Sequence, residues 1–383
     1  ENITASSLTL TDTQKTAIKN AFAISIADNA STDSVNWTYN ISEANLDFLP
    51  KDEIITAVFI VDIYDNAATP VKIDTQEVTI KIQGTNDTPI ITSSVADARG
   101  SVTEAGNNVT GTATASDTLT SSDVDSGATK TWSLDTTAGT YGGISIDSST
   151  GVWTYTLDNT KSATKALQTG DKKTETFIAT VSDGTDSAQQ TIIIEVNGTN
   201  DAPTLTLPTT ITFTDTNANN TFASQTGTLS SSDDDANDTE VFNITGQSAD
   251  TSENGFTHSK VGTYGTLYLN AISGAYKYIP NDAAIEALTA DTSETFDFTV
   301  TDSKEASDTK TLTINITATN DTPTITVETN NSDADSLYET NSTLTTSGTL
   351  SVTDLDLTNV VSSSVISCSD STALSMLTLD TNS

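Results

Sequence analysis

The sequence contains very little cysteine, histidine or arginine, with one residue of each: Cys368, His258 and Arg99. A single cysteine allows neither an intrachain disulfide nor a thiolate metal site, and we expect Cys368 to be a small buried residue. A single imidazole excludes a site built on two histidines and leaves at most one histidine for acid–base catalysis. We therefore predict a protein that is not an enzyme, and we expect His258 to lie in an exposed polar loop.

Positive charge is also scarce, because 15 lysine and arginine residues face 52 acidic residues, which gives a net charge of −37. Such a chain cannot neutralise phosphate groups, so we predict no nucleic-acid partner, and an anionic membrane surface would repel it. The absence of any apolar run of 18 or more residues predicts no direct membrane insertion. Carboxylates clustered in oxygen-rich loops instead suit calcium.

A hexapeptide is repeated three times, as GTNDTP at 84–89, GTNDAP at 198–203 and ATNDTP at 318–323. The intervals between the asparagines, 114 and 120 residues, suit a sandwich domain and are too long for one turn of a solenoid. The pattern starts and stops part-way through a repeat, which is typical of a segment of a longer protein. We predict complete domains at 90–203 and 204–323, the back half of a domain at 1–89 and the front half of another at 324–383.

Three further markers keep step with the hexapeptide, which separates a true repeat from chance in a chain rich in Thr, Ser and Asp. An acidic residue follows each linker at a similar distance, an Asp-x-Asp motif comes next, and an aromatic pair spaced by two precedes each linker. The acidic residues are Glu104, Asp215 and Glu339, and the aromatic pairs are Trp37/Tyr39, Trp153/Tyr155 and Tyr276/Tyr278.

The periodicity within each repeat is that of β-strands. Residues 176–196 contain two β-rich runs around Asp183-Gly184, which predicts a hairpin, and GVWTYTL alternates as a half-buried strand does. The best helix signal is at 11–22, and short helical turns are expected in EANLDFL and NDAAIEAL. We predict an all-β fold of immunoglobulin-like or cadherin-like antiparallel sandwiches arranged end to end, with the aromatic pairs in their cores.

Several motifs in order resemble the VCBS repeats of giant bacterial surface adhesins: SGTLSVTDLDL, GVWTYTLDN, a Phe-x-apolar-x-Val-x-Asp strand and the closing GTNDAP. The resemblance covers nearly the whole chain. It implies an extender module in cell-surface or biofilm attachment, an extracellular location at a bacterial surface and export by type I secretion. It also implies calcium at the domain junctions, as in cadherins. The leucine-Asp-Arg-Glu stretch of cadherins is absent, so one set of ligands is missing or supplied differently.

Calcium takes six to eight oxygen ligands, which separate loops can supply at a junction between sandwiches. The acidic residue after one linker would point to the far end of its own domain, and the Asp-x-Asp of the next domain would point back toward the linker. The expected ligands are Asn86, Asp87, Asp123 and Asp125 at the first linker, with Asp183 as a further candidate; Glu104, Asn200, Asp201, Asp233, Asp235 and Asp302 at the second; and Asp215, Asn320, Asp321, Asp354 and Asp356 at the third.

A metal-free alternative stays open, because Asn-Asp-x-Pro makes a good turn by itself and Asp-Gly suits a tight hairpin. The function we predict is a structural or extender segment that calcium at its linkers makes rigid, with neighbouring repeats of the same or an identical chain as partners. The alternatives are a filament subunit whose split domains are completed by neighbouring chains, and a module that binds a glycan or protein at a cell surface or in a matrix.

Overall fold

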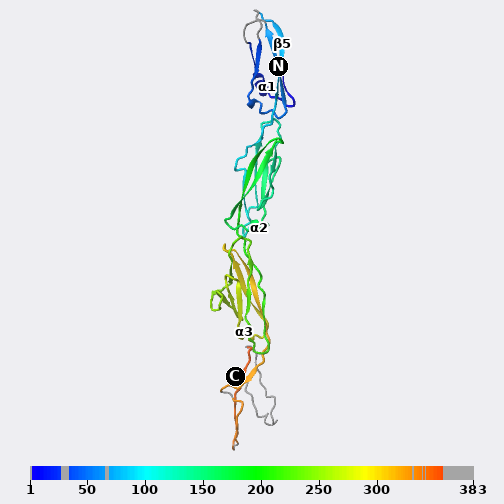
Figure 1. Ribbon diagram of the computed structural model, residues 1–383. Helices are drawn as coiled ribbons and strands as arrows, with labels where there is room; N and C mark the ends of the chain where they lie inside the picture. The colour runs from blue at the N-terminus through cyan, green and yellow to red at the C-terminus, as the bar shows by residue number, and fades with distance from the viewer. Residues whose placement is uncertain are drawn as a thin grey trace. The chain divides into compact units, whose positions relative to one another are not determined.

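The computed structural model describes residues 2–26, 34–64, 69–329, 332–338, 340 and 342–356 (Figure 1). The predictions for Glu339 and Cys368 lie outside these residues. The chain divides into two compact units, Glu1–Thr199 and Asn200–Ser383, and each is described by itself. Strands dominate both units, which confirms the predicted all-β class.

Helices are short in the described part of the chain: α1 Asp12–Asn20, the 3-10 turn η1 Glu43–Asn45, α2 Ser162–Lys165 and α3 Asp282–Glu286. Helix α1 begins with a capping box, in which the Thr11 side chain accepts from the Gln14 backbone and the Gln14 side chain accepts from the Thr11 backbone. The helical segments predicted around 11–22, in EANLDFL and in NDAAIEAL are thus confirmed. None of the helices in the described ranges has the length and apolar character needed to cross a membrane.

The first unit begins with a small set of strands around a core that includes Ile18, Ile55 and Phe59. One sheet has the order β1-β4-β5 and a separate hairpin pairs β2 with β3. Helix α1 covers this core with Ile18, which is fully buried. The strands are β1 Asn2–Ala5, β2 Phe22–Ile26, β3 Val35–Tyr39, β4 Ile54–Tyr64 and β5 Lys72–Gln83.

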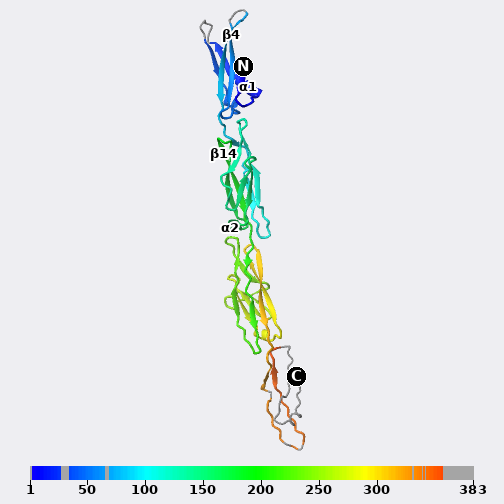
Figure 2. The same ribbon diagram turned by 90° about the vertical axis from the view of Figure 1, so that its right-hand side faces the viewer.

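The rest of the first unit forms a sandwich of two sheets, β10-β13-β14-β7 and β11-β12-β8 (Figure 2). Strands β13 and β14 pair from Lys172↔Asn197 to Ser182↔Ser187, so the hairpin predicted around Asp183-Gly184 is present. Strand β7 is parallel to β14. The strands are β6 Ile90–Ile91, β7 Arg99–Thr103, β8 Thr114–Thr118, β9 Ser121–Ser122, β10 Thr131–Leu134, β11 Gly142–Ile146, β12 Val152–Leu157, β13 Lys172–Ser182 and β14 Ser187–Asn197.

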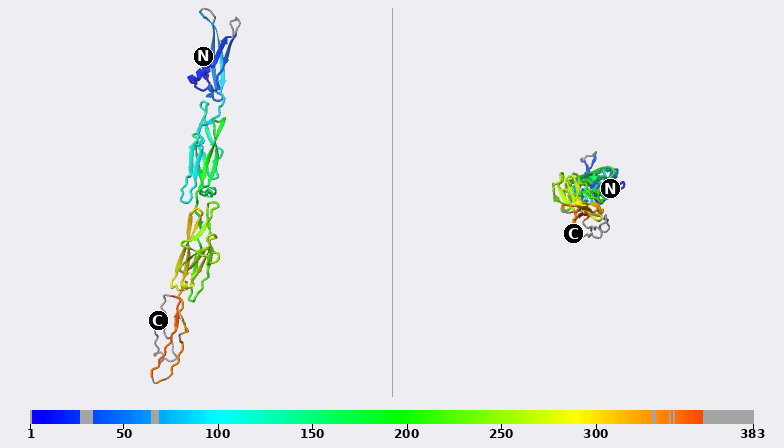
Figure 3. Two further views of the ribbon diagram at one scale, coloured as in Figure 1. Left: turned by 90° about the vertical axis from the view of Figure 1, so that its left-hand side faces the viewer. Right: turned by 90° about the horizontal axis from the view of Figure 1, so that it is seen from below.

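The second unit repeats this topology (Figure 3). Its sheet β16-β25-β24-β19 corresponds to β7-β14-β13-β10, and its sheet β17-β23-β22 is extended by β21 and β20. His258 lies on β21 and is half-buried, so the expectation of an exposed loop is wrong. Strand β21 pairs with β22, which covers part of the His258 surface. The strands are β15 Thr204–Leu205, β16 Ile211–Thr214, β17 Gln225–Thr228, β18 Ser231–Ser232, β19 Val241–Ile244, β20 Ser248–Ala249, β21 His258–Val261, β22 Gly265–Leu269, β23 Ala275–Pro280, β24 Thr292–Thr301, β25 Ser307–Thr317, β26 Thr324–Thr326 and β27 Ser351–Thr353.

The aromatic pairs of β12 and β23 lie in the sandwich cores, as the alternation predicts. The prediction is wrong for Trp37 of the remaining pair, which is 48% exposed because its strand β3 pairs only with β2 in the described part of the first unit. Trp153, Tyr155 and Tyr278 are completely buried. Each core also contains a tyrosine–glutamate hydrogen bond of 2.5 Å, from Tyr155 Oη to Glu175 and from Tyr278 Oη to Glu294. The bond gives each tyrosine hydroxyl a partner at the place where its ring fills the core.

Candidate cation-binding junctions

The linker aspartate and the Asp-x-Asp motif are joined by a chain of hydrogen bonds at the first linker. The backbone N–H of Asp87 donates to Asp125 Oδ2 at 2.9 Å, and the N–H of Asp125 donates to Asp123 Oδ1 at 3.0 Å. Backbone donors thus hold one oxygen of each Asp-x-Asp carboxylate and leave its second oxygen for another ligand. Asp123 Oδ2 and Asp125 Oδ1 are buried and accept no hydrogen bond.

The same two bonds recur at the other linkers, which shows that the sequence repeat carries a repeated geometry. Asp201 N–H donates to Asp235 at 2.9 Å and Asp321 N–H donates to Asp356 at 2.7 Å. Within the two motifs, the N–H groups of Asp235 and Asp356 donate to Asp233 and Asp354 at 2.9 Å and 3.0 Å. The matched offsets in sequence therefore correspond to matched contacts in space.

The linker asparagine lies beside the hairpin that follows the long strand. Asn86 Nδ2 donates to Asp183 Oδ2 at 3.0 Å, and Asn200 Nδ2 donates to Asp302 Oδ2 at 2.7 Å. The other oxygen of Asp183 and of Asp302 accepts backbone N–H groups of its own turn, including those of Thr185 and Lys304. The turn and junction interpretations of these aspartates are therefore compatible, because one oxygen caps the turn while the other meets the linker.

The acidic residue at the end of the first strand contacts the residue before the linker asparagine. Thr199 N–H donates to Glu104 Oε2 at 3.3 Å, and Thr319 N–H donates to Asp215 Oδ2 at 3.1 Å. The threonine hydroxyls donate to the carbonyls of the same two acidic residues. Because Glu104 belongs to the first unit, its meeting with Asn200, Asp201, Asp233, Asp235 and Asp302 of the second unit stays a prediction.

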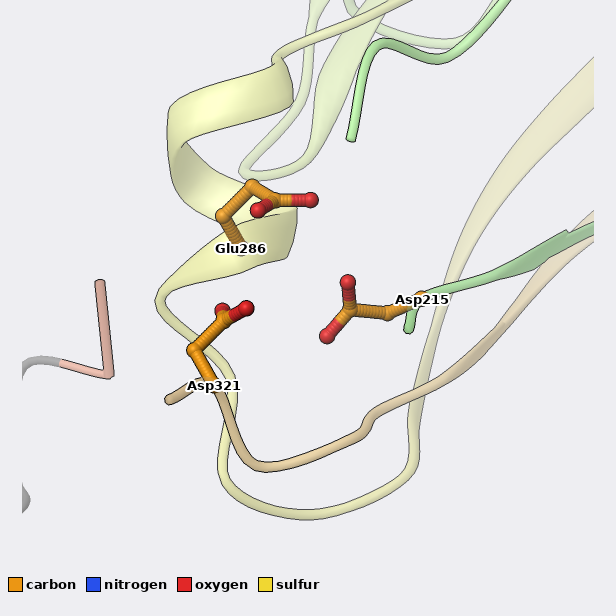
Figure 4. Close-up of side chains that lie close together, drawn as sticks. All are labelled: Asp215, Glu286 and Asp321. Carbon is orange, nitrogen blue, oxygen red and sulfur yellow. The ribbon is translucent and has the colours of Figure 1, made fainter. Parts of the chain in front are cut away.

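Three buried carboxylates converge at the third linker (Figure 4). Asp215 follows β16, Glu286 ends α3 and Asp321 belongs to the linker, and one oxygen of each lies within 4.8 Å of the others. Their exposed fractions are 1%, 2% and 2%. Both oxygens of Glu286 and of Asp321 are buried and accept no hydrogen bond of ordinary geometry. Figure 4 shows the three carboxyl groups turned toward a common space.

Burial and the charges of neighbouring carboxylates raise the pKa of Asp321 and of Glu286. The pKa of Asp321 is raised by burial first and then by Asp215, Asp356 and Asp354. Burial also raises the pKa of Glu286, a nearby backbone N–H of Asn220 opposes the change in part, and Asp215 and Asp321 add to it. Three anionic groups in so dry a place are unfavourable unless a cation compensates them.

A second group, Asp233, Asp238 and Asp302, lies at the opposite end of the same sandwich, with one oxygen of each within 4.8 Å of the others. Oδ2 of Asp233 and Oδ2 of Asp238 are buried without a hydrogen-bond partner. Burial raises the pKa of neighbouring Asp235 to about 6, against the Asp201 backbone bond, and Asp233 and Asp201 raise it further. This group gathers the carboxylates of two loops.

The donor sets suit calcium. They consist of carboxylate oxygens with an amide oxygen nearby, since Asn200 Oδ1 is buried without a hydrogen-bond partner. Calcium accepts six to eight such oxygens in flexible geometry, whereas zinc prefers nitrogen and sulfur ligands that these loops do not contain. A bound calcium ion would supply the positive charge that the buried carboxylates require.

Sequence reasoning missed three of the acidic residues: Asp47, Asp238 and Glu286. Burial raises the pKa of Asp87 first, followed by the charges of Asp125 and Asp47, which places Asp47 in the electrostatic environment of the first linker. Asp47 and Glu286 each stand two residues before a leucine, Leu49 or Leu288, that contacts a core. That spacing is the signal that could have identified them.

A family model for the bacterial cadherin-like domain matches residues 86–198 and 200–318, which is more than half of the chain. The chain therefore belongs to the bacterial cadherin-like domain family. This result confirms the predicted cadherin-like resemblance and agrees with the sandwich topology.

The chain is similar to solved cadherin structures at low sequence identity. The protocadherin GammaB4 extracellular domain is 15% identical, with 93% of this chain and 49% of that chain covered and a TM-score of 0.39. Mouse cadherin-23 EC22-24 is 14% identical, with 78% and 87% covered and a TM-score of 0.34. The chain spans about half the length of the protocadherin structure. A comparison with curated protein sequences gives no significant match. Because the TM-scores lie below 0.5, the family assignment rests on the domain match alone.

Proposed function

We propose that the chain is an extracellular structural segment, an extender of a bacterial surface adhesin or a biofilm-matrix fibre, whose domain junctions bind calcium. The family match supports an adhesion or structural role, and we propose no enzymatic activity. The observation that carries the calcium proposal is the buried group Asp215, Glu286 and Asp321, in which four carboxylate oxygens accept no hydrogen bond. Without a cation, this arrangement opposes folding of the junction.

The third linker would bind the ion through groups from both sides of the linker. Asp215 and Glu286 come from the sandwich that precedes it, Asp321 from the linker, and Asp356 from the segment that follows. The Thr319 and Asp321 backbone donors orient two of these carboxylates. A cation bound to this set would join the segments by charge compensation, so that the linker loses its freedom to bend.

The other two linkers would work in the same way. At the first, the proposed ligands are Asp47, Asp87, Asp123 and Asp125, with Asn86 and Asp183 beside them. At the second, Glu104 would act with Asn200, Asp201, Asp233, Asp235 and Asp302, and Asp238 joins this set. We further propose complete domains at 90–203 and 204–323 and a VCBS-type repeat exported by type I secretion.

The test is calcium titration of the chelator-treated 383-residue chain, followed by melting temperature and by hydrogen exchange of peptides that contain the linkers. Calcium should raise the melting temperature and protect the linker amides from exchange. At a free calcium concentration of about 100 times the dissociation constant, one site adds roughly 2.7 kcal/mol to the free energy of unfolding. Magnesium at equal concentration is the matched control, because it keeps its water and demands a smaller octahedral site. Identical melting and exchange with calcium and with chelator would contradict the proposal.

A second candidate, a filament subunit completed by neighbouring chains, has one observation in its favour. In the described part of the first unit, β3 pairs only with β2, whereas its counterpart β12 lies between β11 and β8. Trp37 on β3 is accordingly 48% exposed, while Trp153 on β12 is completely buried. Sedimentation velocity at increasing concentration with calcium decides between the candidates, since a filament subunit should associate and an extender segment should remain monomeric.

A further inference from the structure

Strands β3 and β5 are edge strands in the part of the first unit that the structure describes. Strand β3 pairs only with β2, whereas its counterparts β12 and β23, which carry the other aromatic pairs, each lie between two strands. Strand β5 pairs only with β4, whereas its counterparts β14 and β25 also pair with β7 and β16. The open side of an edge strand presents backbone N–H and C=O groups, and it is a template for one more strand.

The side chains beside the open edge of β3 belong to a core that is not covered. Trp37 stacks on Phe22 with 6.0 Å between ring centroids, and Phe22 stacks on Phe59 of the core at 4.2 Å. Ile24 is the partner of Trp37 across the hairpin, so it lies on the same face, and it is 54% exposed. Trp37 is 48% exposed, whereas Trp153, its counterpart on β12, is fully buried. The core around Phe59 is therefore open on the side where β8 covers β12.

The segment after the third linker has apolar side chains at core positions, and these are also exposed. Three of them are between 49% and 62% exposed: Ile325, Leu337 and Leu350. Their counterparts, at matching distances from the repeated motifs of the second sandwich, are at most 5% exposed: Leu205, Phe213 and Leu229. Residues 345–349 have no regular secondary structure, although the equivalent residues form strands β8 and β17. The segment thus has the sequence of covering strands without a core to cover.

A glycine in this segment matches the aromatic ring that needs cover. In the second sandwich, Gly227 on β17 pairs with Tyr276 on β23, and a Cβ on Gly227 would lie 2.3 Å from the tyrosine ring. The sequence SGTLS around Gly348 repeats the sequence TGTLS around Gly227. Tyr276 and Trp37 are the first members of equivalent aromatic pairs. Gly348 is therefore the residue that leaves room for a ring in the place of Trp37.

We propose that this segment of one copy of the chain adds two strands to the first unit of a second copy. Residues 345–350 pair antiparallel with β3, as β8 pairs with β12, and residues 334–338 pair parallel with β5, as β7 pairs with β14. Gly348 then lies opposite Trp37, and the exposed leucines of the segment enter the open core. The two units that meet belong to different copies, and the contact is heterologous, so copies can continue into a filament.

This inference rests on the filament candidate proposed above and names the segment that completes it. It needs no calcium, because the contact consists of strand pairing and apolar burial. The net charge of −37 on each copy opposes the contact. Association should therefore become stronger as salt screens this repulsion, which is the opposite of what an interface built on ion pairs shows.

The test is sedimentation velocity of the full 383-residue chain over a concentration series, in chelator and in calcium. The unmodified chain should form species larger than a dimer in both. Leu350→Ser and Trp37→Ser should each weaken association by at least about tenfold, because each removes a large apolar group from the contact. Leu355→Ser is the matched control, since its counterpart Val124 is 55% exposed in its own sandwich, and it should associate as the unmodified chain does.

Mixing the two weakened variants tests the direction of the contact. The Leu350→Ser copy retains its open edges and the Trp37→Ser copy retains its segment, so an equimolar mixture should form dimers and nothing larger. A mixture that stays monomeric, or equal effects of Leu350→Ser and Leu355→Ser, would overturn the inference. Circular dichroism checks the fold of each variant, and the comparison of Leu350→Ser with Leu355→Ser decides alone if Trp37→Ser does not fold.

The outcomes also separate this inference from the calcium junctions. An unmodified chain that is monomeric at every concentration and salt would overturn the strand pairing, while calcium binding at the linkers stands. Association that is the same in chelator and in calcium, together with linkers that calcium does not protect, would overturn the calcium junctions and leave the strand pairing in place.

Discussion

The backbone N–H of Asp321 donates to Asp356 Oδ2 at 2.7 Å, although the two residues are 35 positions apart. The bond joins the linker to the segment after β27 and fixes one oxygen of Asp356. Asp321's own carboxylate is turned toward Asp215 and Glu286 instead (Figure 4). One residue thus contacts one side of the junction through its backbone and the other through its side chain, which is why substitutions of its side chain are informative.

Asp321→Asn should have opposite effects with and without calcium. The substitution keeps the backbone bond to Asp356 and the size of the side chain, but it removes one of three buried negative charges. Without metal, the melting temperature should stay the same or rise, because repulsion is relieved. With calcium, the stabilisation should fall by about 1–3 kcal/mol through the lost charged ligand. Thermal unfolding in chelator and in calcium measures both effects.

Glu77→Gln is the control for Asp321→Asn, because Glu77 is an exposed carboxylate on β5 far in sequence from the third linker. It should change the free energy of unfolding by less than about 0.5 kcal/mol, both in chelator and in calcium. A loss of stability in Asp321→Asn that is equal with and without calcium would show a packing role and would count against the metal site.

Asp201→Ala should loosen the second linker without unfolding either unit. The N–H that donates to Asp235 is a backbone group and survives the substitution, so the contact at 2.9 Å is retained. What is lost is a carboxylate proposed as a calcium ligand. Hydrogen exchange of the 198–203 peptide in calcium should become faster, while exchange in β13 and β24 should stay unchanged. Faster exchange throughout both strands would indicate that Asp201 supports the fold itself.

The metal-free chain should gain stability when the pH falls from 7 to 5. Burial raises the pKa of Asp235 to about 6, and burial also raises the pKa of Asp233, Asp321 and Glu286. A group whose pKa is higher in the folded state binds protons more tightly there, so its stabilising contribution is full at low pH and is lost as the pH rises through about 6. Groups with lowered pKa, such as Glu53 at about 2, lose their contribution only below this window.

Urea unfolding at pH 5 and 7 in chelator measures this gain. Calcium should reduce or reverse it, because the ion requires the deprotonated carboxylates and protons compete with it below pH 6. If the metal-free chain is less stable at pH 5 than at pH 7, these carboxyl groups do not have a pKa that burial raises in the folded state.

Much of the fold could be predicted from the sequence because its determinants are local. Alternation predicts Trp153 and Tyr155 in a core, and Asp183-Gly184 predicts the turn of the hairpin; both are found. The Asp-x-Asp motif and the linker aspartate keep nearly constant spacing, so their hydrogen-bonded contact was accessible from repeats alone. Whether they bind metal is a question of charge compensation that spacing does not answer.

The missed carboxylates have a different origin. Asp47 and Glu286 share a place two residues before a core leucine, but Lys165 has that place in the middle repeat, and its distance in sequence to the following linker differs from repeat to repeat. Only the spacing to the leucine marks it. Asp238 follows Asn237, whose φ of 63° matches the φ of 79° at Gly127, and the residue after Gly127 is Ala128. Asp238 was therefore identified only when backbone conformation aligned the repeats.

Tyr278→Phe should destabilise the second unit through the carboxylate that it leaves behind. Tyr278 Oη donates to Glu294 Oε1 at 2.5 Å, while Glu294 Oε2 accepts from Thr263 N–H at 2.9 Å. Loss of the hydroxyl leaves one carboxylate oxygen without its donor, at a cost of about 1–3 kcal/mol. Urea unfolding at pH 7 measures the cost, and it should be independent of calcium because the pair lies in the sandwich core.

Tyr276→Phe is the matched control for Tyr278→Phe, since Tyr276 lies on the same strand and its pKa is raised by burial alone, with no carboxylate partner involved. It should cost clearly less than Tyr278→Phe. The equivalent change in the first unit, Tyr155→Phe, removes the donor of Glu175 and should repeat the larger loss. Equal losses for Tyr276→Phe and Tyr278→Phe would mean that the hydroxyl–carboxylate pair adds nothing beyond ring packing, and that the repeated bond is a consequence of the fold rather than a source of its stability.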